Sequence, residues 1–188
     1  SEHHLLEALW VYQHQDVVEP RLLKRLLQAK EPRARAAATR VLQHWYARID
    51  GAITLVQQLI KDPAPRVRLE AVRLLSFVPT PEAAETALEA LRQPTDYYLQ
   101  YVLDSTMTTL EKFWKPVLTS GRPFSADNPE GLAFLLARLE PSELSTAPPG
   151  VPVYRAMLER PGIEPRIRQQ ALEGLSKLNG SQPLTELI

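Results

Sequence analysis

Four side chains suited to molecular recognition recur at intervals of about thirty residues along this chain. They are Trp10, Arg40, Arg73 and Asp104. Tryptophan and arginine often dominate the binding energy of protein interfaces, and a regular interval brings such residues into one column when structural units stack. We therefore predict that these four side chains form a recognition strip on the inner face of a repetitive fold. The alternative is a solvated face with a weak surface ion pair between Arg73 and Asp104.

The same interval places further polar and aromatic side chains in two neighbouring columns. One column holds His14, His44, Phe77 and Thr108, and the other holds Glu7, Ala37, Glu70 and Tyr101. Metal sites need three or four converging ligands, and no third ligand accompanies the two histidines, so we expect surface histidines and no metal. The predicted interaction surface comprises Trp10, Arg40, Arg73, Asp104, Tyr101, His14 and His44.

Catalytic and cofactor-binding patterns are absent from the sequence. There are no cysteines, which excludes disulfides, thiolate catalysis, cysteine-ligated zinc and attachment of c-type haem within these residues. None of the seven glycines stands in a phosphate-binding loop, and neither a Ser-His-Asp triad nor a pair of catalytic carboxylates is supported. We expect no catalytic residue and no cofactor in this domain.

The elements that carry these columns follow from a phrase that occurs three times. Pro-Arg-x-Arg begins at Pro32, Pro65 and Pro165, and each copy continues with an alanine and a leucine on one helical face. Proline suits the first turn of a helix, and a small alanine allows a neighbouring helix to approach closely. The phrase places arginines and alanines in corresponding positions: Arg35, Ala38, Arg68, Ala71, Arg168 and Ala171.

A second amphipathic helix precedes each copy, and proline or glycine separates the helices. These helices are expected at 21–29, 52–60, 82–91, 132–139 and 153–158, with a long helix from Pro94 to Trp114. The pattern predicts an all-α stack of about four to six helix pairs in one domain, 1–188, with irregular stretches at 119–128 and 140–152. Because a helical pattern begins at once after Ser1, we expect a piece of a longer protein.

These phrases resemble HEAT repeats, whose second helix commonly opens with an acidic residue and proline, followed by an arginine. Glu31-Pro32 with Arg35 and Asp62-Pro63 with Arg68 fit that pattern. The resemblance implies an α-α superhelix in which Arg35, Arg68 and Arg168 join adjacent inter-helix turns. It also implies a protein-interaction role.

A closer resemblance is to the HEAT-repeat segment of bacterial multidomain proteins classed as membrane-bound dehydrogenases. It is carried by Leu6–Trp10, Arg35–Leu42, Val67–Arg73, Asp96–Leu99 and Leu110–Trp114. Those proteins join a sugar-dehydrogenase-like propeller, the HEAT repeats and a C-terminal c-type haem domain. The resemblance implies a non-catalytic spacer in an exported, periplasmic electron-transfer protein, with haem elsewhere in the parent protein. We expect no membrane span in this segment, because no apolar run approaches the ~20 residues needed to cross a bilayer.

Two enzyme classes compete with the scaffold interpretation. HEAT-like glycosylases grip duplex DNA and remove alkylated bases with concave Trp, Asp and Arg side chains, but equal numbers of acidic and basic residues disfavour phosphate binding here. A HEAT-like lyase would need a general acid, for which Asp104 and Glu70 are the candidates.

An aromatic group on the predicted long helix offers a docking site for a neighbouring domain. It consists of Tyr97, Tyr98, Tyr101 and Trp114, with Tyr98 expected in the core.

Overall fold

The computed structural model describes residues 1–125 and 127–182, and every regular element in this part of the chain is helical. This confirms the predicted all-α class. The elements are α1 (Glu2–His14), α2 (Pro20–Leu27), α3 (Pro32–Trp45), η1 (Tyr46–Arg48), α4 (Ala52–Leu59), α5 (Pro65–Leu75), α6 (Pro81–Leu88), η2 (Glu89–Arg92), α7 (Tyr97–Thr109), α8 (Glu111–Thr119), α9 (Pro129–Leu136), α10 (Pro141–Leu144), α11 (Val151–Glu159) and α12 (Pro165–Asn179).

The chain divides into two compact units, residues 1–111 and residues from 112 onward. The prediction that residues 1–188 form a single HEAT-repeat domain stays a prediction.

Local chemistry at the helix ends explains where the helices begin. Proline occupies the first turn of eight of the described helices, where its missing N–H is not needed. The Asp96 carboxylate accepts a hydrogen bond from the Leu99 amide at 2.8 Å and so caps α7. The Asn128 side chain caps α9 in the same way, at 2.9 Å from the Gly131 amide.

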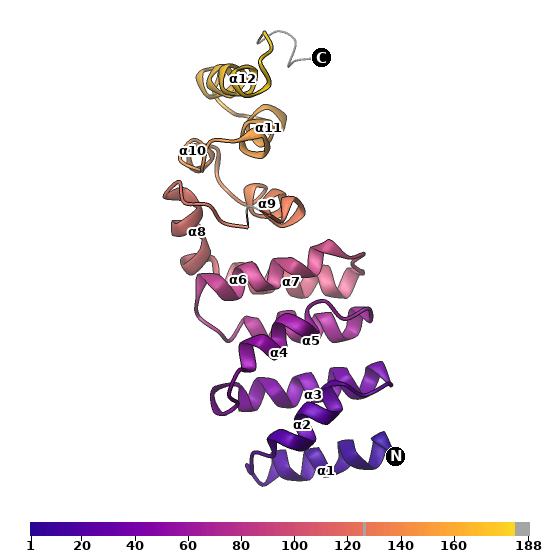
Figure 1. Cartoon of the computed structure of the whole chain (residues 1–188). Coiled ribbons are helices and arrows are strands. Elements are labelled where there is room, and N and C mark those ends of the chain that lie inside the picture. The colour runs from indigo at the N-terminus through magenta and orange to yellow at the C-terminus, as the bar shows by residue number, and fades with distance from the viewer. Residues whose placement is uncertain (126, 183–188) are drawn as a thin grey trace. The chain divides into compact units, whose positions relative to one another are not determined.

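Unit 1 consists of two helical layers (Figure 1). In one layer α1, α3, α5 and α7 follow one another in space, each packed against the next. In the other layer α2 packs on α3, α4 on α5 and α6 on α7. The fully buried Ala38 and Ala71 lie in α3 and α5, where their small side chains allow these helices to pack closely.

In unit 2, as in unit 1, small residues lie between packed helices and an arginine contacts carbonyl groups at a helix end. Within it α9 and α10 pack on α11, and α11 packs on α12, where Ala171 is fully buried. The guanidinium group of Arg160 donates hydrogen bonds to the carbonyl oxygens of Leu136 and Leu139 at the end of α9. Gly174 of α12 faces the ring of Tyr154 so closely that a Cβ atom would collide with it. Arg160 and Gly174 thus set the spacing of these helices.

The prediction of one long helix from Pro94 to Trp114 is wrong. The chain instead forms two helices, α7 and α8, with a break at Leu110. The sequence before the break is rich in threonine. The Thr108 and Thr109 hydroxyls donate to the carbonyl oxygens one turn earlier, at 3.0 and 2.9 Å, and such bonds compete with continuation of the helix.

Candidate functional site

Arg35 joins two successive inter-helix turns of unit 1. Its Nε and Nη2 atoms donate to the two carboxylate oxygens of Asp62 at 2.7 and 2.8 Å, a bidentate pair in which both side chains are largely buried. Its Nη1 atom donates to the carbonyl oxygens of Ala29 and Lys30 at 2.8 and 3.1 Å. The hydrogen bonds that Arg35 donates to the Asp62 carboxylate raise the pKa of Arg35 above its usual value, so the guanidinium group stays charged.

Arg68 repeats this arrangement in the next helix pair of unit 1. It is more deeply buried than Arg35, with 1% of its surface exposed. It donates to the carbonyl oxygens of Asp62 and Pro63 in its own turn, at 2.8 and 3.2 Å. It also donates to Gln93 Oε1 at 3.0 Å and to the Pro94 carbonyl in the next turn. Burial lowers the pKa of Arg68, and nearby carboxylates counteract that effect. The many carbonyl acceptors make this buried charge tolerable.

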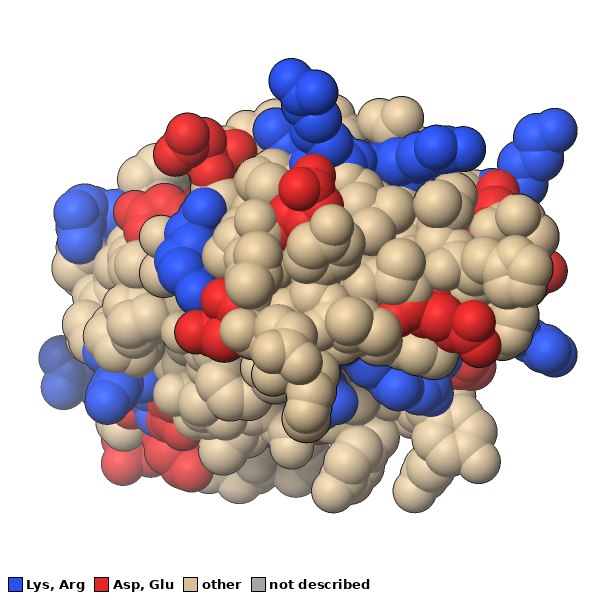
Figure 2. Space-filling model, turned by 90° about the horizontal axis from the view of Figure 1, so that it is seen from below, with Lys and Arg blue, Asp and Glu red and all other residues tan. Residues whose placement is uncertain are grey.

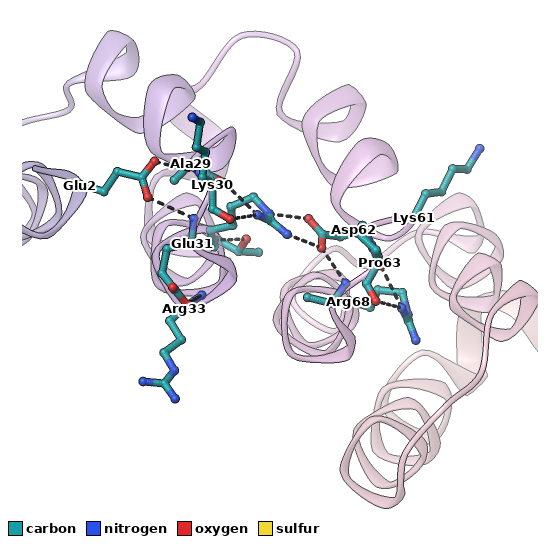
Figure 3. A network of polar contacts seen from close by, with 12 residues as sticks. Glu2, Ala29, Lys30, Glu31, Arg33, Lys61, Asp62, Pro63 and Arg68 are labelled. Atoms are coloured by element: carbon teal, nitrogen blue, oxygen red, sulfur yellow. Dashed lines mark hydrogen bonds and ion pairs between the residues drawn. The ribbon is translucent and has the colours of Figure 1, made fainter.

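A ladder of such contacts runs along the inter-helix turns of unit 1 (Figure 3). At its first rung the Glu2 carboxylate accepts from the Lys30 and Glu31 amides at 2.8 and 3.1 Å. The next rungs are the Arg35–Asp62 pair and the Arg68 contacts. The ladder supplies partners to carbonyl and amide groups that helix ends leave unpaired. It is a structural site, and it holds successive helix pairs in register.

Arg168 corrects the expectation that all three phrase arginines join adjacent turns. It lies exposed in α12 and donates to the Arg160 carbonyl at 3.1 Å, which belongs to its own inter-helix turn. Among the described residues no later turn follows α12 to supply the second set of acceptors. Within the described residues, Arg35 and Arg68 therefore reach a second inter-helix turn and Arg168 does not.

The predicted recognition strip lies exposed on successive helices of one layer of unit 1. Trp10 is 46% exposed in α1, and Arg40, Arg73 and Asp104 are exposed in α3, α5 and α7. Tyr101 is 64% exposed in α7, and His14 and His44 are exposed in α1 and α3. Exposure makes these side chains accessible to a partner, and their role as a recognition strip stays a prediction.

Glu70 departs from its predicted place. Its side chain is only 1% exposed, and it accepts from Arg40 Nη2 of α3 at 2.6 Å. Arg73 has its Nη1 atom 4.0 Å from Glu70 Oε2. The alternative pair of Arg73 with Asp104 stays a prediction. The same-helix spacing of Arg66, Glu70 and Arg73 is the sequence signal that could have identified this cluster. The bond to Glu70 raises the pKa of Arg40.

The aromatic group also differs from its prediction. Tyr98 was expected in the core but is 67% exposed, and its ring meets the Tyr97 ring edge-on with centroids 5.5 Å apart. The core side of α7 is occupied by Leu99 and Leu103, and neighbouring residues of a helix point about 100° apart. Trp114 is buried in α8.

The surface at the α1 end of the molecule carries both positive and negative side chains (Figure 2). Lysine and arginine side chains alternate there with aspartate and glutamate among uncharged residues. In the described part of the chain no group of three or more potential metal ligands converges. No helix within 1–125 and 127–182 is both long enough and apolar enough to cross a bilayer.

The paired variants Arg68→Met and Arg168→Met test the ladder. Removing Arg68 leaves several buried carbonyl acceptors without a donor, so we expect the free energy of unfolding to fall by about 3 kcal/mol. The same change at exposed Arg168 should alter it by less than about 0.5 kcal/mol. Urea unfolding followed by circular dichroism measures both, and equal losses would show that the ladder does not stabilise unit 1.

The first rung predicts a pH dependence. The amides of Lys30 and Glu31 lower the pKa of Glu2, so its stabilising effect is present above the unfolded-state pKa and is lost as the pH falls through the folded-state value. Glu2→Gln should therefore lower the melting temperature near neutral pH, and the difference from wild type should vanish in acid. A difference that is the same at every pH would contradict the role of the charge.

One part of the chain matches a known protein family. A model of HEAT repeats matches residues 19–105, which span α2 to most of α7 and contain Arg35, Asp62 and Arg68. No curated protein and no solved structure matches this chain. Residues 19–105 are therefore a segment of HEAT repeats.

Proposed function

We propose that this chain is a non-catalytic protein-interaction scaffold whose binding surface is the exposed strip on α1, α3, α5 and α7. The observation that carries the proposal is the combination of exposed Trp10 and Tyr101 with a frame held in register by buried Arg68. A rigid frame reduces the entropy lost on binding, so exposed aromatic side chains can contribute more to affinity. HEAT repeats suit protein–protein interaction and are generally non-catalytic.

The finer part of the proposal concerns the parent protein. The resemblance of Leu6–Trp10 and Asp96–Leu99 to the HEAT segment of multidomain dehydrogenases supports a spacer between a propeller and a c-type haem domain. Such a parent would be an exported, periplasmic electron-transfer protein. In this proposal the haem and the redox chemistry belong to other domains, and this segment binds no cofactor.

The enzyme alternatives receive less support from the site. A DNA-gripping face needs a row of cationic side chains that contacts successive phosphates, whereas the chain has equal numbers of acidic and basic residues. Of the two general-acid candidates of the lyase alternative, Glu70 has its carboxylate buried against arginines and not open to a substrate. Asp104, the other candidate, is exposed in α7.

Site-specific cross-linking tests the scaffold function directly. A photoreactive phenylalanine derivative in place of Tyr101 should, on irradiation, join α7 to another domain of the same chain or to a second protein. The experiment uses the full-length protein produced in its natural host. The control places the same group at Gln57, exposed on α4 in the other layer, where we expect little cross-linking.

Two outcomes bear on the proposal in opposite ways. Cross-links from Tyr101 to a propeller or haem domain would support both the scaffold and the spacer role. Equal cross-linking from Gln57, or no protein product from Tyr101, would contradict the assignment of this face as the binding surface.

A further inference from the structure

A buried carboxylate gathers three half-exposed arginines on unit 1. Arg40 Nη2 and Arg66 Nη2 lie 2.6 and 3.1 Å from Glu70 Oε1, and Arg73 Nη1 lies 4.0 Å from Glu70 Oε2. The Glu70 side chain is buried, whereas each arginine side chain keeps about half of its surface exposed. We call Arg40, Arg66 and Arg73 the arginine triad.

The arginine triad carries an excess of positive charge toward the solvent. Three guanidinium groups surround one carboxylate, and they still outnumber the carboxylates if Asp104 of the adjacent helix α7 is included. Glu70 cannot turn outward without leaving its buried position in α5. The excess charge is therefore a fixed property of this surface and not an accident of mobile side chains.

The geometry of the arginine triad suits carboxylate ligands. Each guanidinium group has five N–H donors in a planar fork, and contact with one carboxylate oxygen of Glu70 uses only part of them. Arg73 has the longest contact, and Glu70 Oε2 has no hydrogen-bond partner among the described residues. Arg73 is therefore the side chain of the arginine triad that can most readily rotate to pair with a carboxylate of a ligand.

We propose that the arginine triad is the docking point for an acidic segment of a partner protein, whose Asp or Glu side chains pair with guanidinium groups held around Glu70. The proposal rests on the scaffold function and names the chemistry of its partner. Tyr97 and Tyr101, exposed on the adjacent helix α7, would supply apolar contact area for the polypeptide.

A protein partner is favoured over a nucleic acid by the extent of the charge. Nucleic acids are held by rows of cationic side chains that follow a phosphate backbone, whereas the arginine triad is one compact cluster centred on a single carboxylate. The chain as a whole has equal numbers of basic and acidic residues, which does not favour long-range attraction to a polyanion.

Fluorescence anisotropy with a labelled glutamate-rich peptide tests the proposal, with a glutamine-rich peptide of equal length and a duplex DNA as comparisons. The double variant Arg40→Gln/Arg73→Gln should weaken glutamate-peptide binding by about tenfold at low salt. The control Arg21→Gln/Arg25→Gln removes the same charge from exposed positions of α2 and should leave binding within about twofold of wild type. Thermal melts confirm that each variant is folded, and the single variant Arg73→Gln replaces the double variant if the latter unfolds.

The outcomes separate this proposal from the scaffold function. Selective loss in the triad variant supports it. It is overturned if the glutamate peptide does not bind, if the glutamine peptide binds equally well, if the α2 control loses as much affinity, or if duplex DNA binds more tightly. In each of those cases the cross-linking from Tyr101 still decides independently whether this face binds protein.

Discussion

The contact on which unit 1 depends is the reach of one arginine side chain across two inter-helix turns. Helix ends leave carbonyl groups without partners, and several of these groups gather where Asp62, Pro63 and Pro94 meet. The Arg68 guanidinium group satisfies them together, and its own buried charge is balanced by the same acceptors. Because one side chain contacts two turns, neither helix pair can slide without breaking several bonds.

The binding surface follows from that constraint. With the turns fixed, residues at the same place in α1, α3, α5 and α7 fall into columns, and those that do not face the core remain at the surface. Trp10 and Tyr101 are held outward by backbone that is already ordered, so little order remains to be gained on binding. Glu70 adds a second level of organisation, because it holds arginines from two helices around one buried point.

The repeated phrase made much of the fold predictable. Helix periodicity identified α3, α5 and α12, and the small residues Ala38, Ala71 and Ala171 are fully buried. The same phrase could not tell how Arg168 differs from Arg68, because its environment depends on whether another helix pair follows. Burial of this arginine is a property of stacking and is not encoded within a single repeat.

The candidate site was less predictable because it depends on small rotations about helix axes. Side chains of neighbouring residues in a helix point about 100° apart, so Tyr98 is exposed while Leu99 is buried. For the same reason Glu70, which was predicted in a surface column, lies buried in α5. The break after Thr109 was hidden by apolar periodicity, since threonine–backbone bonds leave that pattern intact.

Native-state hydrogen exchange of individual amides tests the central claim most directly. The Lys30, Glu31 and Ala64 amides lie in turns and bond to Glu2 or Asp62 of the ladder. If the ladder makes the helix pairs open together, these turn amides should have the same free energy of opening as the core amides of α3 and α5. The comparison is made from exchange rates at low denaturant concentration. Exchange of the turn amides at a much lower free energy, with the helices still protected, would show that the turns open independently and would contradict the account.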